Sequence, residues 1–260
     1  MTTAPLPTVF VSHGAPTLAM GSSDARNFLS GLGDTLGQPR AILCISAHWE
    51  TATPMVSAAP APETIHDFYG FPRALYEISY PAPGAEALAE RAAALLAATG
   101  LECGIDTERG LDHGAWVPLM LMYPAADVPV IQLSVLPATS ADTHIAMGRA
   151  LAALRHDGVL VLASGSAVHN LRHFVPDGKD VPDWAISFDD WLTEAVETSS
   201  AERIGGYLAE HPDALTAHPT AEHFLPLPVA FGAAGEEPKG RVLYRGFMDG
   251  ALSMAAFAFD

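Results

Sequence analysis

The stretch Val159-Leu160-Val161-Leu162-Ala163 is an uninterrupted apolar run of strand length, followed at once by the turn Ser164-Gly165-Ser166. A strand without polar residues at alternate positions has both faces covered, so this run predicts a central strand of a largely parallel sheet. The chain on either side alternates apolar runs with helical patterns, and this alternation is typical of an α/β fold. We therefore predict a three-layer α/β/α architecture around a central mixed, largely parallel sheet.

Further strands and helices are expected on both sides of this run. The other apolar runs of strand length cover residues 8–11, 41–46, 54–58, 128–135, 242–247 and 252–259. Helical patterns cover residues 83–99, 113–123, 139–156 and 184–198. Another segment can begin at Ala221 with Thr220 as its cap, and Pro226 and Pro228 are expected to kink or shorten it.

Nothing in the chain marks a domain boundary. The 260 residues contain no internal repeat and no long linker, so we expect a single domain over residues 1–260. The stretch 57–72 is irregular and rich in proline and glycine. Long loops of this kind in compact domains are often functional, and we expect this one to be a lid.

The charge balance excludes some classes of partner. The chain has 13 basic and 30 acidic residues and a formal net charge of −17. Nonspecific binding to nucleic acid depends on contacts between basic residues and phosphates, so we expect no nucleic-acid partner. The same balance disfavours an anionic membrane surface, and no segment has the roughly 18 uninterrupted apolar residues that a membrane span requires. The sequence leaves open whether the protein forms a homo-oligomer.

The two cysteines indicate a reducing compartment. Cys44 lies inside an apolar run, where it is expected to be a small buried hydrophobe, and Cys103 is its only companion. Two cysteines in a chain of this length do not form a disulfide framework. The first seven residues have neither a basic region nor an apolar stretch, so no signal peptide is expected. A cytoplasmic location is the expectation.

Histidines at the ends of apolar runs or in Gly/Pro-punctuated turns are the strongest functional signal. His13, His48 and His169 each follow, or closely follow, a predicted strand. Ligands bind outside the carboxyl ends of the strands in open α/β sheets, so these three imidazoles can converge on one patch. His113 and His223 occur in similarly unusual surroundings. Imidazole is the commonest ligand for metals such as zinc and the side chain best suited to proton transfer near neutral pH.

Other histidines and motifs carry less information. A single histidine is more often a structural, hydrogen-bonded residue than a ligand, and this interpretation fits the polar loops and helix faces that hold His66, His144, His156, His211 and His218. His173 lies four residues after His169 and could share a helical face with it, but the pair lacks the glutamate of a His-Glu-x-x-His zinc motif. The serines of Ser164-Gly165-Ser166 are expected to form a turn, because the motif of a hydrolase nucleophile is absent.

Seven short motifs occur in order and resemble a known family. The set is similar to the class III extradiol ring-cleavage dioxygenases, and more narrowly to their DOPA 4,5-dioxygenase-like branch, relatives of the catalytic subunit of protocatechuate 4,5-dioxygenase. The resemblance extends from about Thr8 to Met254. It rests on Ser12-His13-Gly14-Ala15-Pro16, Ser46-Ala47-His48-Trp49, Ile65-His66-Asp67-Phe68-Tyr69-Gly70-Phe71-Pro72, Asp112-His113-Gly114, Gln132-Leu133-Ser134, His169-Asn170-Leu171 and Glu222-His223-Phe224-Leu225-Pro226.

The resemblance implies a role for each motif. It places the metal ligands on His13, His48 and His223, and it identifies His169 as a fourth ligand or as the catalytic acid/base. His113 corresponds to a further catalytic histidine of the pocket. The segment containing His66, Phe68 and Tyr69, together with Trp49, is expected to contact the substrate. Better-known members use two histidines and a glutamate, the open facial pattern of non-haem iron. Here Glu222 and His223 are consecutive, so only one of them should be a ligand, and we predict His223.

These implications define a leading hypothesis and two alternatives. The resemblance implies an enzyme, an oxidoreductase that opens the ring of a catechol-type, DOPA-like aromatic with O₂ and uses one divalent metal per chain. Ring cleavage requires a redox-capable ion such as Fe(II), whereas an all-histidine site also suits Zn(II), which has no redox chemistry. The alternatives are a zinc-dependent hydrolase, either an amidase or an esterase, and a non-catalytic zinc-binding protein.

Overall fold

The apolar stretch at residues 159–163 forms the interior of β6 (Val159–Gly165), all of whose residues are buried. The computed structural model describes residues 5–260 and places β6 within an eight-stranded sheet. β6 pairs in parallel with β1 (Thr8–Ser12) on one side and with β2 (Ala41–Glu50) on the other. β2 in turn pairs in parallel with β5 (Val130–Val135). The predicted central position of this strand is confirmed.

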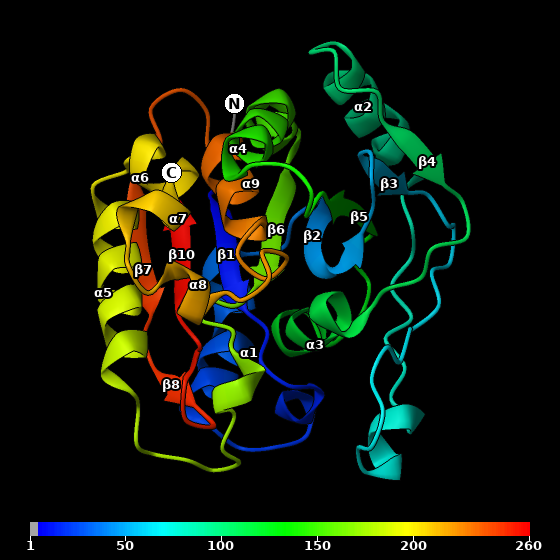
Figure 1. Cartoon of the computed structure of the whole chain (residues 1–260). Coiled ribbons are helices and arrows are strands. Elements are labelled where there is room, and N and C mark those ends of the chain that lie inside the picture. The colour runs from blue at the N-terminus through cyan, green and yellow to red at the C-terminus, as the bar shows by residue number, and fades with distance from the viewer. Residues whose placement is uncertain (1–4) are drawn as a thin grey trace.

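The outer strands make the sheet mixed. The strand order is β4-β3-β5-β2-β6-β1-β10-β7. At one side β3 (Met55–Ser57) runs antiparallel to β5, and β4 (Gly104–Asp106) runs parallel to β3. At the other side β10 (Ala256–Phe259) runs antiparallel to both β1 and β7 (Gly240–Tyr244). The predicted mixed, largely parallel sheet is therefore observed, with its parallel strands in the middle (Figure 1).

Helices cover both faces of the sheet. Successive side chains of a strand point to opposite faces, and Phe10 accordingly belongs to one apolar core while Val9 and Val11 belong to the other. The core around Phe10 is closed by α2 (Glu86–Ala97), α4 (Ala141–Leu151), α5 (Asp183–Glu197) and α9 (Pro226–Ala233). The opposite core is closed by α1 (Asp24–Leu36) and α3 (His113–Met122). Three α/β/α layers result.

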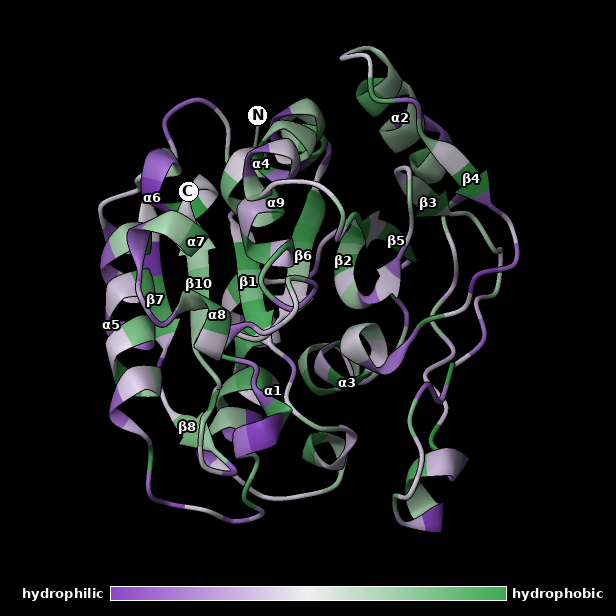
Figure 2. Cartoon of the chain, viewed as in Figure 1, coloured by the Kyte–Doolittle hydropathy of each residue, from purple (hydrophilic) through white to green (hydrophobic). Residues whose placement is uncertain are grey.

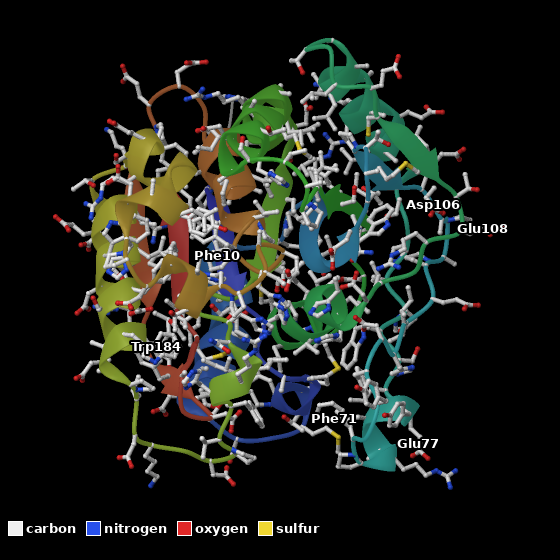
Figure 3. The ribbon with its side chains drawn as sticks, viewed as in Figure 1. Phe10, Phe71, Glu77, Asp106, Glu108 and Trp184 are labelled. Carbon is white, nitrogen blue, oxygen red and sulfur yellow. The ribbon has the colours of Figure 1, made fainter. Side chains whose placement is uncertain are left out.

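The distribution of polarity agrees with this layering. The central strands are coloured as hydrophobic in Figure 2, whereas α5 and the outer loops carry most of the hydrophilic segments. Phe10 lies over the middle of the sheet in Figure 3, and the carboxylates of Glu77, Asp106 and Glu108 lie at the outer margin of the molecule. Within residues 5–260, no helix is both long and apolar enough to cross a bilayer.

Helix α1 was not expected from the sequence. Ser23 caps it by accepting a hydrogen bond from the Arg26 N–H, but glycines at positions 31 and 33 weaken the helical pattern. Gly33 has a packing role, because a Cβ on this residue would lie 2.0 Å from the carbonyl oxygen of Met122. The glycine that obscures the helix in the sequence therefore allows α1 to pack closely against α3.

The other differences concern short elements and boundaries. The segment expected from Ala221 becomes helical only at Pro226, which occupies the first turn of α9, where its missing N–H costs nothing. The last predicted strand divides into β9 (Leu252–Ser253), paired with β8 (Phe247–Met248), and β10. Residues 152–157, at the end of the helix predicted over 139–156, form the separate short helix η3 (Ala152–Asp157). The short helices that the sequence did not predict are η1 (Pro16–Ala19), η2 (Arg73–Glu77), η4 (Leu171–His173), α6 (Ala201–Gly205), α7 (Tyr207–Glu210) and α8 (Ala214–Ala217).

Candidate metal centre and active site

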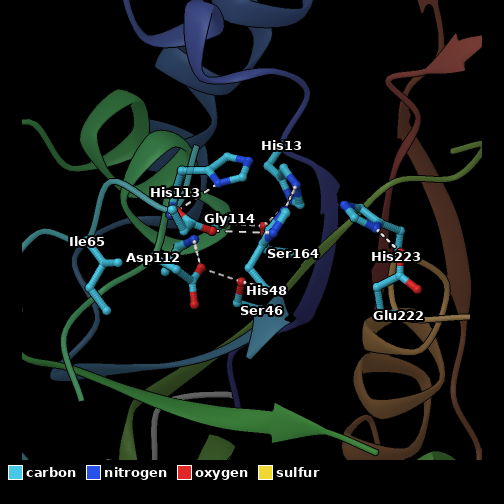
Figure 4. A network of polar contacts seen from close by, with 12 residues as sticks. His13, Ser46, His48, Ile65, Asp112, His113, Gly114, Ser164, Glu222 and His223 are labelled. Atoms are coloured by element: carbon cyan, nitrogen blue, oxygen red, sulfur yellow. Dashed lines mark hydrogen bonds and ion pairs between the residues drawn. The ribbon is translucent and has the colours of Figure 1, made fainter. Parts of the chain in front are cut away.

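Three of the five histidines come from the carboxyl ends of parallel strands. His13 directly follows β1, and its backbone N–H donates to the carbonyl of Gly165 at the end of β6, over 3.0 Å. His48 lies near the end of β2. His169 follows β6, and its N–H donates to the Ala217 carbonyl over 2.9 Å. Because β1, β6 and β2 are adjacent, residues far apart in sequence lie at one edge of the sheet (Figure 4).

The other two histidines reach the same edge from outside the strands. His113 is the first residue of α3, which is capped by the side chain of Asp112. His223 precedes α9, and its carbonyl accepts a hydrogen bond from the Ser166 N–H over 3.0 Å. A Cβ on Gly165 would lie only 2.1 Å from the His223 carbonyl oxygen. A glycine at the end of β6 therefore lets the His223 loop approach the sheet.

The five imidazoles form one cluster. The Nε2 atoms of His13 and His48 are 3.1 Å apart. The ring of His223 is centred 5.3 Å from that of His13 and 4.9 Å from that of His48. The ring of His113 lies 4.0 Å from that of His48, and the ring of His169 stacks on His223 at 3.5 Å. Ligand bonds of about 2.0–2.1 Å place neighbouring nitrogens of one ion about 3 Å apart, so this spacing fits a metal site.

Two neighbouring groups of side chains have the spacing of metal ligands. In one group, single ligand atoms of His13, His48 and His113 all lie within 4.8 Å of one another. The second group, with the same limit, consists of His169, Glu222 and His223. The two groups are neighbours, because the His223 ring contacts those of His13 and His48.

Hydrogen bonds orient two of the rings. The Ser164 hydroxyl donates to the Gly114 carbonyl, so its oxygen is left to accept a hydrogen bond from Nδ1–H of His13, 3.0 Å away. Nδ1 of His223 lies 2.9 Å from Oε1 of Glu222, and a carboxylate can only accept. Both rings therefore carry their proton on Nδ1 and present the lone pair of Nε2 (Figure 4). Partners of this kind normally fix the tautomer of metal-binding histidines.

Asp67 contacts two further histidines at once. Its Oδ2 lies 3.4 Å from Nδ1 of His48, and its Oδ1 lies 3.0 Å from Nδ1 of His113 and accepts the His113 backbone N–H over 2.9 Å. Burial alone would raise the pKa of Asp67, but its contacts with His113 and the proximity of His48 lower the pKa to about 2. Asp67 is therefore ionised near neutral pH and offers Nδ1 of both rings a nearby acceptor, although Nδ1 of His113 makes no hydrogen bond of ordinary geometry within the described residues.

Four of the five imidazoles, those of His13, His48, His169 and His223, are neutral near pH 7. Burial is the largest cause that lowers the pKa of His48 to about 3 and of His169 to about 4, although the nearby carboxylate of Glu222 raises both. Burial and the neighbouring imidazoles lower the pKa values of His13 and His223 well below the usual range. Neutral imidazole is the form that binds metals and accepts protons, so the cluster fits a divalent ion.

A second polar network, made by Ser46, Arg109 and Asp112, lies next to the imidazole cluster. Asp112 is fully buried, which raises its pKa, and its side chain accepts the Ala115 N–H over 3.1 Å. The Ser46 hydroxyl donates to Asp112 over 2.5 Å, and the Arg109 guanidinium lies 2.8 Å from it. Arg109 also donates to the His48 carbonyl over 3.3 Å. This network fixes the start of α3 relative to the end of β2.

A cavity of 530 Å³ opens over the imidazoles, within the usual range for a small-molecule site. All five histidines line it. The irregular stretch expected to be a lid contributes Phe68 and Phe71 to its wall. The other apolar side chains that line it include Pro16, Leu171, Phe174 and Leu252.

Three residues predicted to contact the substrate do not line this cavity. Trp49 follows His48 on β2 and points to the opposite side, where the Arg109 guanidinium lies 5.3 Å from its ring centre. Tyr69 is 91% exposed. Nε2 of His66 lies 3.0 Å from the Ile78 carbonyl, so this ring supports the loop. Of the four predicted substrate contacts, the structure brings only Phe68 to the cavity.

Sequence reasoning missed the residues that orient the imidazoles. Asp67 stood inside a recognised motif but had no assigned role, and Ser164 was expected only to form a turn. Their signal is weak, because an acceptor for Nδ1 needs no fixed spacing from its histidine. His173 does not pair with His169, because its ring packs on Trp184 at 5.1 Å and does not line the cavity.

Buried neutral imidazoles beside a mostly apolar cavity, at the carboxyl edge of an α/β sheet, define a candidate metalloenzyme that acts on a small molecule. The chain belongs to a family described as the catalytic LigB subunit of aromatic ring-opening dioxygenase, whose profile matches residues 8–256. The resemblance predicted from the motifs is thereby confirmed. The protein is an extradiol ring-opening dioxygenase, an oxidoreductase.

Relatives support this assignment over the whole chain. A protein of Beta vulgaris named 4,5-DOPA dioxygenase extradiol is 44% identical, with 97% of this chain and 96% of the relative covered. A protein of Escherichia coli K12 with the same name is 41% identical, with 98% and 94% covered. The crystal structure of an uncharacterized protein from Escherichia coli K12 matches with a TM-score of 0.82 and 34% identity, over 98% of this chain and 100% of that one.

Proposed function

We propose that the protein cleaves the ring of a catechol such as DOPA with O₂ and that His13, His48 and His223 hold the metal through Nε2. The observation that carries the proposal is the closeness of the three rings: the Nε2 atoms of His13 and His48 are 3.1 Å apart, and the His223 ring is centred 5.3 and 4.9 Å from theirs. His113, which lies within 4.8 Å of His13 and His48, is the alternative third ligand. The names of the relatives support a DOPA-like substrate. Iron(II) bound there would supply the redox chemistry that joins a catechol to dioxygen, whereas Zn(II) would not.

His169 and His113 act on the substrate in this proposal. The ring of His169 stacks on His223 at the cavity wall, and its lowered pKa of about 4 keeps it neutral near pH 7. The lone pair of this neutral imidazole can accept a proton from a catechol hydroxyl, and its low basicity favours the later return of that proton to an oxygen atom of the opening ring. His113, whose backbone N–H donates to Asp67, lines the cavity and is placed to hydrogen-bond a substrate hydroxyl.

The remaining wall positions the aromatic ring and excludes water. Phe68, Phe71, Phe174 and Leu252 supply apolar surface opposite the imidazoles. Ring stacking and edge contacts with such side chains favour a flat aromatic substrate. We place this activity in one domain covering the chain, in a reducing cytoplasmic setting that agrees with the unpaired Cys44 and Cys103.

The test combines metal content with oxygen uptake. Protein purified without oxygen and loaded with Fe(II) should consume oxygen and form a ring-opened product with DOPA or 4-methylcatechol. His223→Ala should lose both metal and activity. His169→Ala should keep its metal and lose activity by about 10²–10⁴-fold, the usual contribution of general acid–base catalysis. The exposed His156 gives a matched control, His156→Ala, which should behave as wild type.

Two results would reject the proposal. One is the absence of oxygen uptake with every catechol in a broad panel while the protein is fully loaded with iron. The other is a zinc-loaded protein that hydrolyses esters or amides and loses this activity with His48→Ala, which would establish a hydrolase.

A further inference from the structure

The cavity contains two carboxylates and no cationic arginine or lysine side chain among its described lining residues. Glu50 is the last residue of β2 and is exposed to the cavity mouth. Within residues 5–260 its carboxylate makes neither an ion pair nor a hydrogen bond. Glu222 is engaged, since it accepts from Nδ1 of His223 and from the Thr220 hydroxyl, over 2.9 and 3.0 Å. Glu50 is therefore the carboxylate available to a ligand.

The surroundings of Glu50 favour a positive group on the substrate. Asp67 contributes a third negative charge beneath His48 and His113. The negative charge of these three carboxylates exceeds the positive charge of one divalent ion. The apolar walls formed by Phe68, Phe71 and Phe174 weaken solvent screening, so a nearby charge has a larger effect than in water.

The geometry of β2 places Glu50 at a suitable distance from the reacting end. His48 and Glu50 are two residues apart on β2 and both line the cavity, although the pairing of β2 with β5 shifts register between Ile45 and Glu50. Two residues of extended chain separate their Cα atoms by at most about 7 Å. This separation is comparable to that between the hydroxyls of a catechol and an amine two carbons away from its ring.

We propose that the cavity selects catechols with an ammonium group on a short side chain over catechols with only a carboxylate, and that Glu50 recognises the ammonium group. The inference rests on the proposed function, since it specifies the substrate class of the same site. DOPA carries both groups: its ammonium is bound by Glu50, and its carboxylate is directed to solvent. Arg172, exposed beside the cavity residue Leu171, is the competing candidate, because it would favour a carboxylate instead.

The experiment compares three catechols that differ in the charge of one side chain. The probes are dopamine, the neutral 4-ethylcatechol and 3-(3,4-dihydroxyphenyl)propionate. Dissociation constants are measured under nitrogen with metal-loaded protein, and kcat/KM is measured by oxygen uptake. Wild type should prefer dopamine to 4-ethylcatechol by about tenfold and should bind the propionate least well, as expected for one partly screened charge pair.

Matched variants assign the preference to a residue. In Glu50→Gln the dopamine preference should fall to within about twofold of 4-ethylcatechol, and discrimination against the propionate should weaken. Glu90→Gln removes the same charge from the exposed face of α2 and should keep the wild-type ratios. Ratios between substrates are compared, so a general loss of activity in one variant does not affect the conclusion.

Three outcomes overturn the inference. They are a wild-type preference for the propionate, equal binding of all three catechols, and a dopamine preference that survives in Glu50→Gln. A propionate preference that Arg172→Gln removes would assign recognition to Arg172. Failure of the proposed function gives a different result from failure of this inference. In that case 4-ethylcatechol would bind under nitrogen, but the protein would consume no oxygen when oxygen is admitted.

Discussion

Replacing Ser164 by alanine should weaken metal binding without emptying the site. The Ser164 hydroxyl joins Nδ1 of His13 to the Gly114 carbonyl, and the alanine variant loses both contacts. His13 can then adopt the tautomer with its proton on Nε2, and this nitrogen no longer has the lone pair that binds the metal. Loss of such a supporting partner typically reduces metal affinity 10- to 100-fold, or by about 1.4–2.7 kcal/mol. Competition with a chromophoric chelator for Zn(II) or Fe(II) measures this change.

Ser134→Ala is the matched control for this measurement. Ser134 is also fully buried, and its hydroxyl accepts the Met55 N–H over 3.0 Å, away from the imidazoles. Both variants should lower the free energy of unfolding of the metal-free protein by about 1–3 kcal/mol, the cost of leaving a buried polar group unpaired. Only Ser164→Ala should change metal affinity. Equal affinity in Ser164→Ala and wild type would refute the tautomer argument for His13.

Three further predictions test the packing, the charge state and the His223 partner. Gly165→Ala should destabilise the protein by about 1–3 kcal/mol or more in urea unfolding, because its Cβ would meet the His223 carbonyl. Gly31→Ala, in open space on α1, should instead stabilise it by about 0.5–1 kcal/mol. The metal-free protein should lose stability as the pH falls from about 6.5 towards 4. In this interval His169 binds a proton in the unfolded state but not in the folded state, where its pKa is lowered to about 4. Each such histidine contributes about 1.4 kcal/mol per pH unit in that interval, so urea midpoints that do not change between pH 7 and pH 5 would contradict the burial argument. Glu222→Ala should weaken metal binding more than Glu222→Gln, which keeps an oxygen acceptor for Nδ1, and chelator competition would show equal losses if the carboxylate did not orient the ring.

The parallel part of the sheet and the histidines at its edge could be predicted from local patterns. A fully apolar run identifies a central strand, and a histidine after such a run lies at the carboxyl edge. His13 and His48 reached the cluster for this reason. His223 could not be placed in this way, because its loop is held by a contact of its carbonyl with the Ser166 N–H and by the absence of a side chain on Gly165. Only the motif resemblance located it beforehand.

Side chains that line the cavity were harder to predict than the histidines that cluster. Trp49 directly follows His48 but does not line the cavity, and no local pattern indicates this, because the consecutive residues Ala47 and His48 both line it. His66 is polar and next to the motif aspartate, but a backbone carbonyl satisfies it. Tyr69 lies in irregular backbone, where side-chain direction has no period. The face to which a side chain points can therefore be predicted for residues on a strand, but not for residues in an irregular loop.

The irregular loop itself is better described as a fixed wall than as the expected lid. Asp67 anchors it to His48 and His113, and the Trp116 indole N–H donates to the Ile65 carbonyl over 3.0 Å. Opening the loop would expose these groups and leave two imidazoles without an acceptor for Nδ1. Each unmatched buried partner costs about 1–3 kcal/mol, so displacement of the loop must carry an energetic penalty in the metal centre as well. We therefore expect the position of this loop and the orientation of the imidazoles to be coupled, so that substitutions in the loop also change the metal affinity.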